Sequence, residues 1–202
     1  MGLGLRVFLA ALVEFTLIGL ILFLSAGTIA WAAGWVFLGL LSTCSFVFLG
    51  WLLRYCRGLL QERMALFMPD QPLWDRVFLV LLLVSFFGWL VLMALDAVRY
   101  GWSAVPWWLQ GVGGVLLLAS FYVFYLGYRE NPYASAMVRI QEERGQTVIS
   151  TGPYRYVRHP LYAGAILLFL GTGLLLGSWY GTLATLYFLA LLVARIIGEE
   201  RV

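Results

Sequence analysis

The chain has 202 residues, of which 63% are hydrophobic and 11% are charged, and its formal net charge is +3. A soluble domain carries roughly 25% charged residues, so this composition excludes an ordinary soluble protein and indicates an integral membrane protein. The basic residues are all arginine and form no run dense enough to follow the phosphates of a nucleic acid, so we expect no nucleic-acid partner.

Six apolar segments approach or exceed the length of about 20 residues that a helix needs to cross a bilayer. In chain order they cover residues 7–28, 35–53, 77–96, 105–126, 160–177 and 180–198. We therefore predict an all-α, polytopic integral membrane protein with about six transmembrane helices, five being the alternative count. The first segment is too long for a signal peptide, so we expect it to be retained as a helix.

The arginines predict the orientation of these helices. Twelve of the thirteen fall on one side of the predicted membrane, and only Arg99 falls on the other. Because cytoplasmic loops are enriched in basic residues, we expect both termini in the cytoplasm. The expected location is the plasma membrane of a prokaryote, with membrane lipids as neighbours and a cytoplasmic site.

Two polar connections interrupt the apolar pattern. Residues 54–76 are amphipathic, which favours a short helix lying on the membrane over a substrate site. Residues 127–159 form the longest polar stretch, and their prolines and aromatics indicate an ordered, functional loop. We expect one transmembrane domain over 1–202, with four helices in 1–126 and a cofactor-site loop plus helical hairpin in 127–202. Close helix packing is the expected role of five glycines: Gly111, Gly113, Gly114, Gly173 and Gly177.

The densest chemical information lies between Gly152 and Gly164, in the run GPYRYVRHPLYAG. Pro160 suits the first position of the fifth helix, where its missing N–H costs nothing. His159 then stands at the helix N-terminus, where unpaired amides and the positive end of the helix dipole favour an anion. Arg158 adds a permanent positive charge. These features predict a pocket for a carboxylate or phosphate group.

Helical spacing brings the end of the chain to the same level. The helix from Pro160 to the turn at Ser178 spans about 27 Å, and a helix returning from Tyr180 by the same rise reaches Gly198. An antiparallel hairpin would therefore place three charged side chains level with the predicted pocket: Arg195, Glu199 and Glu200. The fourth helix delivers Arg129, Glu130 and Asn131 to the same face. We expect a site for a polar, charged cofactor beside a lipid-accessible cavity.

Each of these residues also has a plainer explanation. His159 and Arg158 could anchor the membrane boundary, and the two glutamates could end a solvated helix. Their occurrence together at matched depth favours a site. A zinc site is not expected, because the chain has one histidine and its two cysteines are in no metal-ligand spacing.

The pattern G-x-Y-x-x-x-R-H-P-x-Y-x-G in residues 152–164, followed by R-x-x-x-E-E in residues 195–200, resembles the isoprenylcysteine carboxyl methyltransferase family and its phospholipid methyltransferase relatives. Gln141 and Val148-Ile149 also fit that family's approach to the motif, and the resemblance covers roughly residues 128–202. It implies methyl transfer from S-adenosyl-L-methionine, with the cofactor arriving from the cytosol and a lipophilic substrate from the bilayer.

The resemblance also implies roles for individual residues. Arg195 would orient the acceptor group, which could be a prenylcysteine-like carboxylate, a lipid amine, or a small hydrophobic acid or thiol. An amine acceptor would need a base, for which Glu130 is a candidate. The implied cofactor-binding residues are Gly152, Tyr154, Arg158, His159, Pro160, Tyr162, Gly164, Glu199 and Glu200.

Two departures from the family pattern keep other interpretations open. Gln146 stands where prenylcysteine enzymes carry histidine, and relatives continue beyond the paired glutamates, whereas this sequence ends at Val202. A membrane NADPH-dependent sterol or steroid reductase shares a related Arg-x-x-x-Tyr-x-Gly run, but Leu161 and Ala165 replace its expected asparagine and acid. A non-catalytic membrane scaffold with a degenerate site is the second alternative.

Overall fold

The computed structural model describes residues 2–63, 71–131, 133 and 149–199, and these residues form helices without any strand. Each of the six apolar segments is helical. The elements are α1 (Leu3–Ala26), α2 (Ala32–Tyr55), α3 (Arg57–Arg63), α4 (Leu73–Ala94), the π-helical turn η1 (Leu95–Arg99), α5 (Trp107–Glu130), the 3-10 turn η3 (Gly152–Arg155), α6 (Pro160–Leu175), α7 (Trp179–Leu183) and α8 (Thr185–Glu199).

Five helical stretches within the described residues are long and apolar enough to cross a membrane. They are α1, α2, α4 with η1, α5, and α7 with α8. The remaining apolar helix, α6, has 16 residues and falls short of that length. The prediction of an all-α, polytopic membrane protein is therefore confirmed, and the alternative counts of six and five differ only in whether α6 is included.

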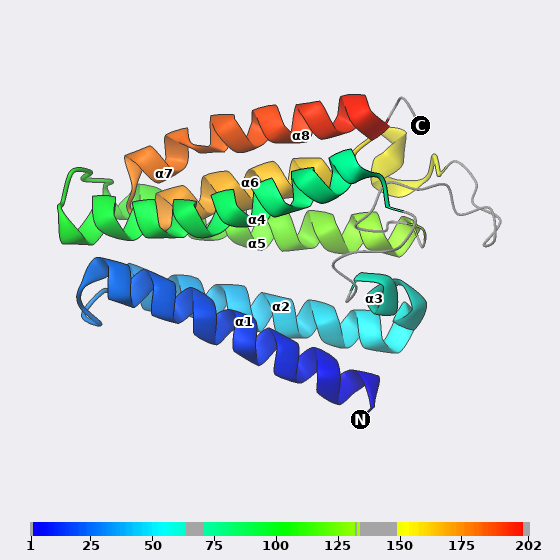
Figure 1. Ribbon diagram of the computed structural model, residues 1–202, viewed down its shortest axis with the longest axis horizontal. Coiled ribbons are helices and arrows are strands. Elements are labelled where there is room, and N and C mark those ends of the chain that lie inside the picture. Colours follow the sequence, from blue (N-terminus) through cyan, green and yellow to red (C-terminus); the bar gives the residue numbers. More distant parts are fainter. Residues whose placement is uncertain (1, 64–70, 132, 134–148, 200–202) are drawn as a thin grey trace.

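The helices run side by side along the long axis of the molecule (Figure 1). The antiparallel pair α1 and α2 lies along one side, and α4 to α8 make up the other, with α1 packed on α4 and α2 packed on α5. The chain enters α1 and leaves α8 at the same end of the molecule (Figure 1). This end therefore collects the N-termini of α4 and α6 and the C-termini of α5 and α8.

The closest helix pair is α5 and α6, and glycines make its approach possible. A Cβ atom added at Gly113 would lie 2.4 Å from the backbone N of Leu175 and 2.7 Å from the carbonyl O of Gly171. Gly173 likewise faces backbone atoms of α7 at 2.6 Å, whereas Gly111 has nothing within 4 Å. The predicted packing role is thus correct for Gly113 and Gly173 and wrong for Gly111, which lies in open space.

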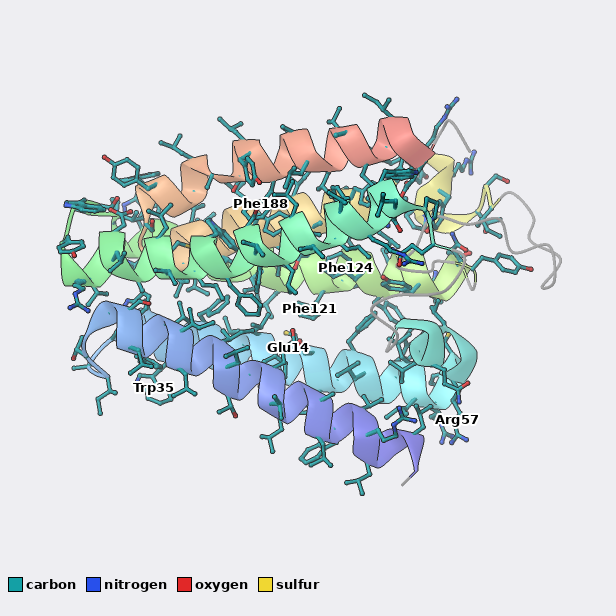
Figure 2. All side chains as sticks on the ribbon, in the orientation of Figure 1. Glu14, Trp35, Arg57, Phe121, Phe124 and Phe188 are labelled. Atoms are coloured by element: carbon teal, nitrogen blue, oxygen red, sulfur yellow. The ribbon has the colours of Figure 1, made fainter. Side chains whose placement is uncertain are left out.

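An aromatic core fixes the hairpin that α6 forms with α7 and α8. The chain turns at Gly177, whose φ of +81° lies in the left-handed region that favours glycine. Below the turn, the rings of Phe169 and Phe188 stack with centroids 4.2 Å apart, and Trp89 of α4 packs edge-on against both. Figure 2 labels Phe188 among the side chains between α8 and its neighbours. These contacts fix the depth at which α8 meets α6.

The amphipathic segment after α2 forms the predicted short helix, α3. Leu59 and Leu60 are buried against Val7, Leu52 and Tyr128, so one face of α3 closes the end of the helix bundle. The side chains of Arg57 and Gln61 are exposed, as expected of the polar face of a helix lying at a membrane surface. Residues 64–70, which complete the segment, lie outside the described residues.

Candidate functional site

A cavity of about 550 Å³ lies between α4, α5, α6 and α8 at the end of the molecule that carries both chain ends. This volume is within the range of small-molecule binding sites. Its apolar lining comes from within the helices, and its polar lining comes from the helix ends and the loop before α6, where the exposed Arg158 marks the side that opens to solvent. The lining residues that the discussion below uses are Phe78, Leu82, Phe124, Asn131, Tyr154, Arg158, His159, Pro160, Tyr162, Arg195 and Glu199.

The centre of the polar wall is Glu199, the last described residue of α8. The Tyr162 hydroxyl of α6 donates a hydrogen bond to Glu199 Oε1, and His159 Nδ1 lies 3.9 Å from Glu199 Oε2. The rings of His159 and Tyr162 stack with centroids 5.4 Å apart. The hairpin thus brings the three side chains together at the level that their spacing along two antiparallel helices predicts.

Arg195 lies one turn before Glu199 on α8 and is only 7% exposed. Its Nε donates a hydrogen bond of 2.9 Å to Glu199 Oε1, and its Nη2 lies 3.3 Å from Asp75 Oδ1 on α4. The guanidinium carbon stands 4.9 Å from the centre of the Phe78 ring. The arginine is therefore held by a carboxylate from each of two helices and lies over an aromatic face.

Sequence reasoning missed the contribution of α4 to this site. Asp75 is fully buried, and Gln71 Nε2 donates a 2.7 Å hydrogen bond to its Oδ2. An acid in the first turn of a helix is ordinarily explained by the positive end of the helix dipole. The amphipathic pattern of residues 54–76 predicts only a membrane-surface element, whereas Asp75 at its end contacts Arg195 on the cavity wall.

The opening of the cavity is lined by loop residues and by the end of α5. Asn131 Nδ2 donates a 3.2 Å hydrogen bond to the Tyr154 hydroxyl, which ties the loop before α6 to the end of α5. Burial raises the pKa of Tyr154 above its usual value, so this phenol stays protonated at neutral pH. Arg158 is exposed at the same opening and keeps its positive charge in contact with solvent.

Gly152 and Glu130 form a loop anchor beside the cavity and do not line it. Gly152 has φ +56°, and a Cβ there would lie 2.4 Å from Cγ of Glu130. Glu130 accepts hydrogen bonds from Thr151 Oγ1 at 3.0 Å and from Arg129 Nη2 at 2.9 Å. The structure therefore gives Glu130 a role in holding η3 and offers no support for its use as a base.

Gly164 makes room for a neighbouring ring. Of the predicted cofactor-binding residues, Glu200 lies outside the described part of the chain. A Cβ at Gly164 would lie 2.8 Å from the ring of Phe124, so the missing side chain makes room for an aromatic wall of the cavity. Pro160 is buried as the first residue of α6 and lines the cavity directly. Glu200, like Gln141 and Gln146, lies outside the described residues.

Fold and cavity together define a polytopic helical membrane protein with a cavity of small-molecule size, lined in part by polar side chains, at one end of its bundle. Residues 108–202 match the sequence model of the phospholipid methyltransferase family. The family resemblance of the two motifs is thereby confirmed. No curated protein and no solved structure matches the chain. The matched segment begins in α5, so α1 to α4 and Asp75 lie outside it.

Proposed function

We propose that the protein is an integral membrane methyltransferase that uses S-adenosyl-L-methionine to methylate a lipophilic substrate. The family match of residues 108–202 supports the reaction class. The observation that carries the proposal is the meeting of Glu199 with Tyr162 and His159 on the wall of one cavity. This arrangement joins the two halves of the family motif, which are separated in sequence by a whole helical hairpin.

The groups around the cavity fit such a cofactor. Arg158 at the opening can pair with its carboxylate, and Glu199 can accept hydrogen bonds from ribose hydroxyls or from its ammonium group. Tyr154 and Phe124 offer aromatic faces, which attract a positively charged sulfonium. When bound, the cofactor supplies a methyl group activated by the positive charge on sulfur.

The protein's own contribution to the reaction is alignment and exclusion of water. The apolar wall formed by Phe78, Leu82 and Phe124 can hold the lipid part of a substrate against the cavity. Removing water there leaves the attacking atom poorly solvated and therefore more reactive. Fixing donor and acceptor in one geometry supplies much of the remaining acceleration, because a methyl transfer from sulfonium needs little acid or base assistance.

The charges around Arg195 favour one class of acceptor. Its guanidinium already contacts the carboxylates of Glu199 and Asp75, so a substrate carboxylate would have to approach two anions. We therefore favour an amine-bearing lipid over a prenylcysteine-like carboxylate or a small hydrophobic acid. The proton lost by an amine can pass to His159 or Glu199, which are proton acceptors on the described cavity wall.

Cofactor binding is the direct test of this proposal. The detergent-purified protein is expected to bind S-adenosylhomocysteine in a calorimetric titration. His159→Ala and Glu199→Ala should abolish that binding while the helical circular dichroism signal stays unchanged, because each removes part of the polar wall. Tyr156→Phe is the matched control, since Tyr156 lies on the same loop, is 82% exposed and does not line the cavity.

Two results would contradict the methyltransferase proposal. Binding of NADPH without binding of S-adenosylhomocysteine would favour the reductase, and binding of neither would favour the scaffold. If the cofactor binds, lipid extracts incubated with a radiolabelled methyl donor should yield a labelled product. An amine-bearing lipid as that product would support the acceptor class, whereas a labelled methyl ester would exclude it.

The distribution of arginine supports one orientation of the site. Of the arginines in the described part of the chain, only Arg99 stands at the end of the bundle opposite the cavity. The positive-inside rule therefore supports a cavity that faces the cytoplasm, and we propose the plasma membrane of a prokaryote as its location. A cysteine introduced at Tyr156 should then resist a membrane-impermeant thiol reagent in intact cells and react in inverted vesicles.

A further inference from the structure

The buried carboxylate of Asp75 stands outside the segment that matches the methyltransferase family, yet it contacts that segment's Arg195. Asp75 is 0% exposed and Arg195 is 7% exposed, so their contact is shielded from water. Removing one partner from such a pair is strongly unfavourable, because the other charge is left buried. Retaining the pair at the wall of the cavity therefore calls for an explanation in terms of the site.

The contacts of Arg195 fix its guanidinium from three directions. Asp75 holds Nη2, Glu199 holds Nε, and the ring of Phe78 lies against the guanidinium carbon. A free arginine side chain loses rotamer entropy when it is ordered, so partners that are already in place make one geometry the stable one. Gln71 in turn donates to the second oxygen of Asp75 and fixes the carboxylate itself.

The ion pair between Asp75 and Arg195 also bears on the polar wall of the cavity, because Arg195 contacts Glu199. The Glu199 oxygen that accepts from Arg195 Nε is also the one that accepts from the Tyr162 hydroxyl. A continuous set of contacts therefore runs from α4, through Arg195 and Glu199 on α8, to Tyr162 on α6. Displacing its first member changes the position of every group that follows.

We infer that Asp75 is a positioning residue for the proposed methyl transfer: it holds Arg195 in the geometry that the reaction requires. The inference rests on the proposed function and adds to it a residue supplied by the helices that precede the matched segment. Asp75 touches the reaction only through Arg195 and does not line the cavity.

A purely structural role in joining α4 to α8 is the competing explanation. The two helices have a second contact that does not involve charge, because the ring of Trp74 approaches Gly198 so closely that a Cβ there would lie 2.9 Å away. Replacing Asp75 by asparagine keeps the shape of the side chain and this second contact. The substitution therefore separates the charge of Asp75 from helix packing.

The test compares Asp75→Asn, Arg195→Lys and the double variant in the whole chain of 202 residues, purified in detergent. In Asp75→Asn we expect kcat for transfer of the radiolabelled methyl group to the lipid acceptor to fall by roughly 10- to 100-fold. A loss of this size is expected when reacting groups shift by about 1 Å. The Kd of S-adenosylhomocysteine should change by less than about threefold. The double variant should be no slower than the slower single one, because both changes remove the same contact.

Two further variants make the test specific. Asp75→Glu should recover part of the lost kcat, since it restores the charge. Asp96→Asn is the matched control: Asp96 is equally buried but lies at the opposite end of the same helical stretch, and its replacement should leave kcat unchanged. If Asp75→Asn fails to fold, Gln71→Leu keeps the ion pair and should lower kcat in the same direction by a smaller factor.

The inference is overturned if Asp75→Asn retains wild-type kcat, or if its effect multiplies with that of Arg195→Lys. A lower melting temperature with unchanged kcat would assign Asp75 to structure alone and would equally overturn it. Measurements on the wild-type protein distinguish failure of the proposed function from failure of the positioning role. Absence of both cofactor binding and methyl transfer in that protein would remove the function, and the positioning role with it.

Discussion

Glu14 is an acid within a membrane-spanning helix, on the face of α1 that otherwise packs against the bundle. Its neighbours on that face, Ala11 and Ile18, are 4% and 1% exposed, whereas Glu14 itself is exposed. In Figure 2 its side chain points from α1 toward the layer that contains Phe121. No hydrogen bond or ion pair among the described residues engages its carboxyl group. An ionisable group at such a depth is costly, and residues of this kind usually mark a functional site.

Replacing Glu14 by glutamine or leucine is expected to raise the melting temperature in detergent by a few degrees. The physical reason is that a charged side chain near the centre of a membrane helix costs about 2.5–3.5 kcal/mol, and the acid here has no partner to offset that cost. Binding of S-adenosylhomocysteine should be unchanged, because Glu14 does not line the cavity. An unchanged or lower melting temperature, or a changed Kd of S-adenosylhomocysteine, would contradict this expectation. Loss of lipid methylation in a stable Glu14→Gln protein that still binds the cofactor would assign Glu14 to the substrate.

The residues of the site divide according to whether sequence spacing alone can locate them. His159, Tyr162 and Glu199 stand at the ends of two consecutive antiparallel helices, so counting residues from the turn between them is enough to bring them together. Asp75 comes from a helix whose place in the bundle depends on tertiary packing. Its distance from Arg195 therefore could not be derived from any spacing in the sequence.

Among the elements, the apolar segments could be predicted and the details of their ends could not. α4 begins at Leu73, directly after Pro72 and four residues before the predicted apolar segment. Its first turn contains the polar residues Asp75 and Arg76, so a search for apolar runs leaves this turn out. α6 ends at Leu175 because Gly177 turns the chain. Glycine patterns were also ambiguous, since Gly111 and Gly113 look alike in sequence but face different surroundings.

This difference between two neighbouring glycines of α5 leads to a prediction about the α5–α6 pair. Gly113→Ala is expected to destabilise the protein by about 1–3 kcal/mol, because the new methyl group would lie within 3 Å of the backbone of α6 and force the helices apart. Gly111→Ala has open space around it and should be neutral, or stabilising by up to about 1 kcal/mol through its better helix propensity. Thermal unfolding followed by circular dichroism measures both effects. Equal stability of the two variants would contradict the close approach of α5 and α6.

Over the whole molecule, polar networks stand at the two ends of the bundle and are separated by its apolar length. At the end opposite the cavity, Asp96 of η1 is fully buried and accepts hydrogen bonds at Oδ2 from Ser103 Oγ at 2.6 Å and Ser178 Oγ at 2.5 Å. The backbone N–H of Tyr180 reaches the same oxygen at 3.3 Å. One carboxylate thus joins the end of α4, the loop before α5 and the start of α7.

Because this network holds elements together far from the cavity, Asp96→Asn should lower the free energy of unfolding without changing cofactor affinity. We expect a loss of about 1.5–3 kcal/mol, the range for a buried hydrogen bond to a charged group, since the neutral amide accepts more weakly from the two serines. Ser103→Ala removes one donor and should cost less than Asp96→Asn does. Both variants should bind S-adenosylhomocysteine with wild-type Kd as long as they remain folded, which calorimetry below the melting transition can measure. A weakened Kd in either variant would mean that the two ends of the bundle are coupled through α4 and α8, and the independence of the site from the opposite end would have to be given up.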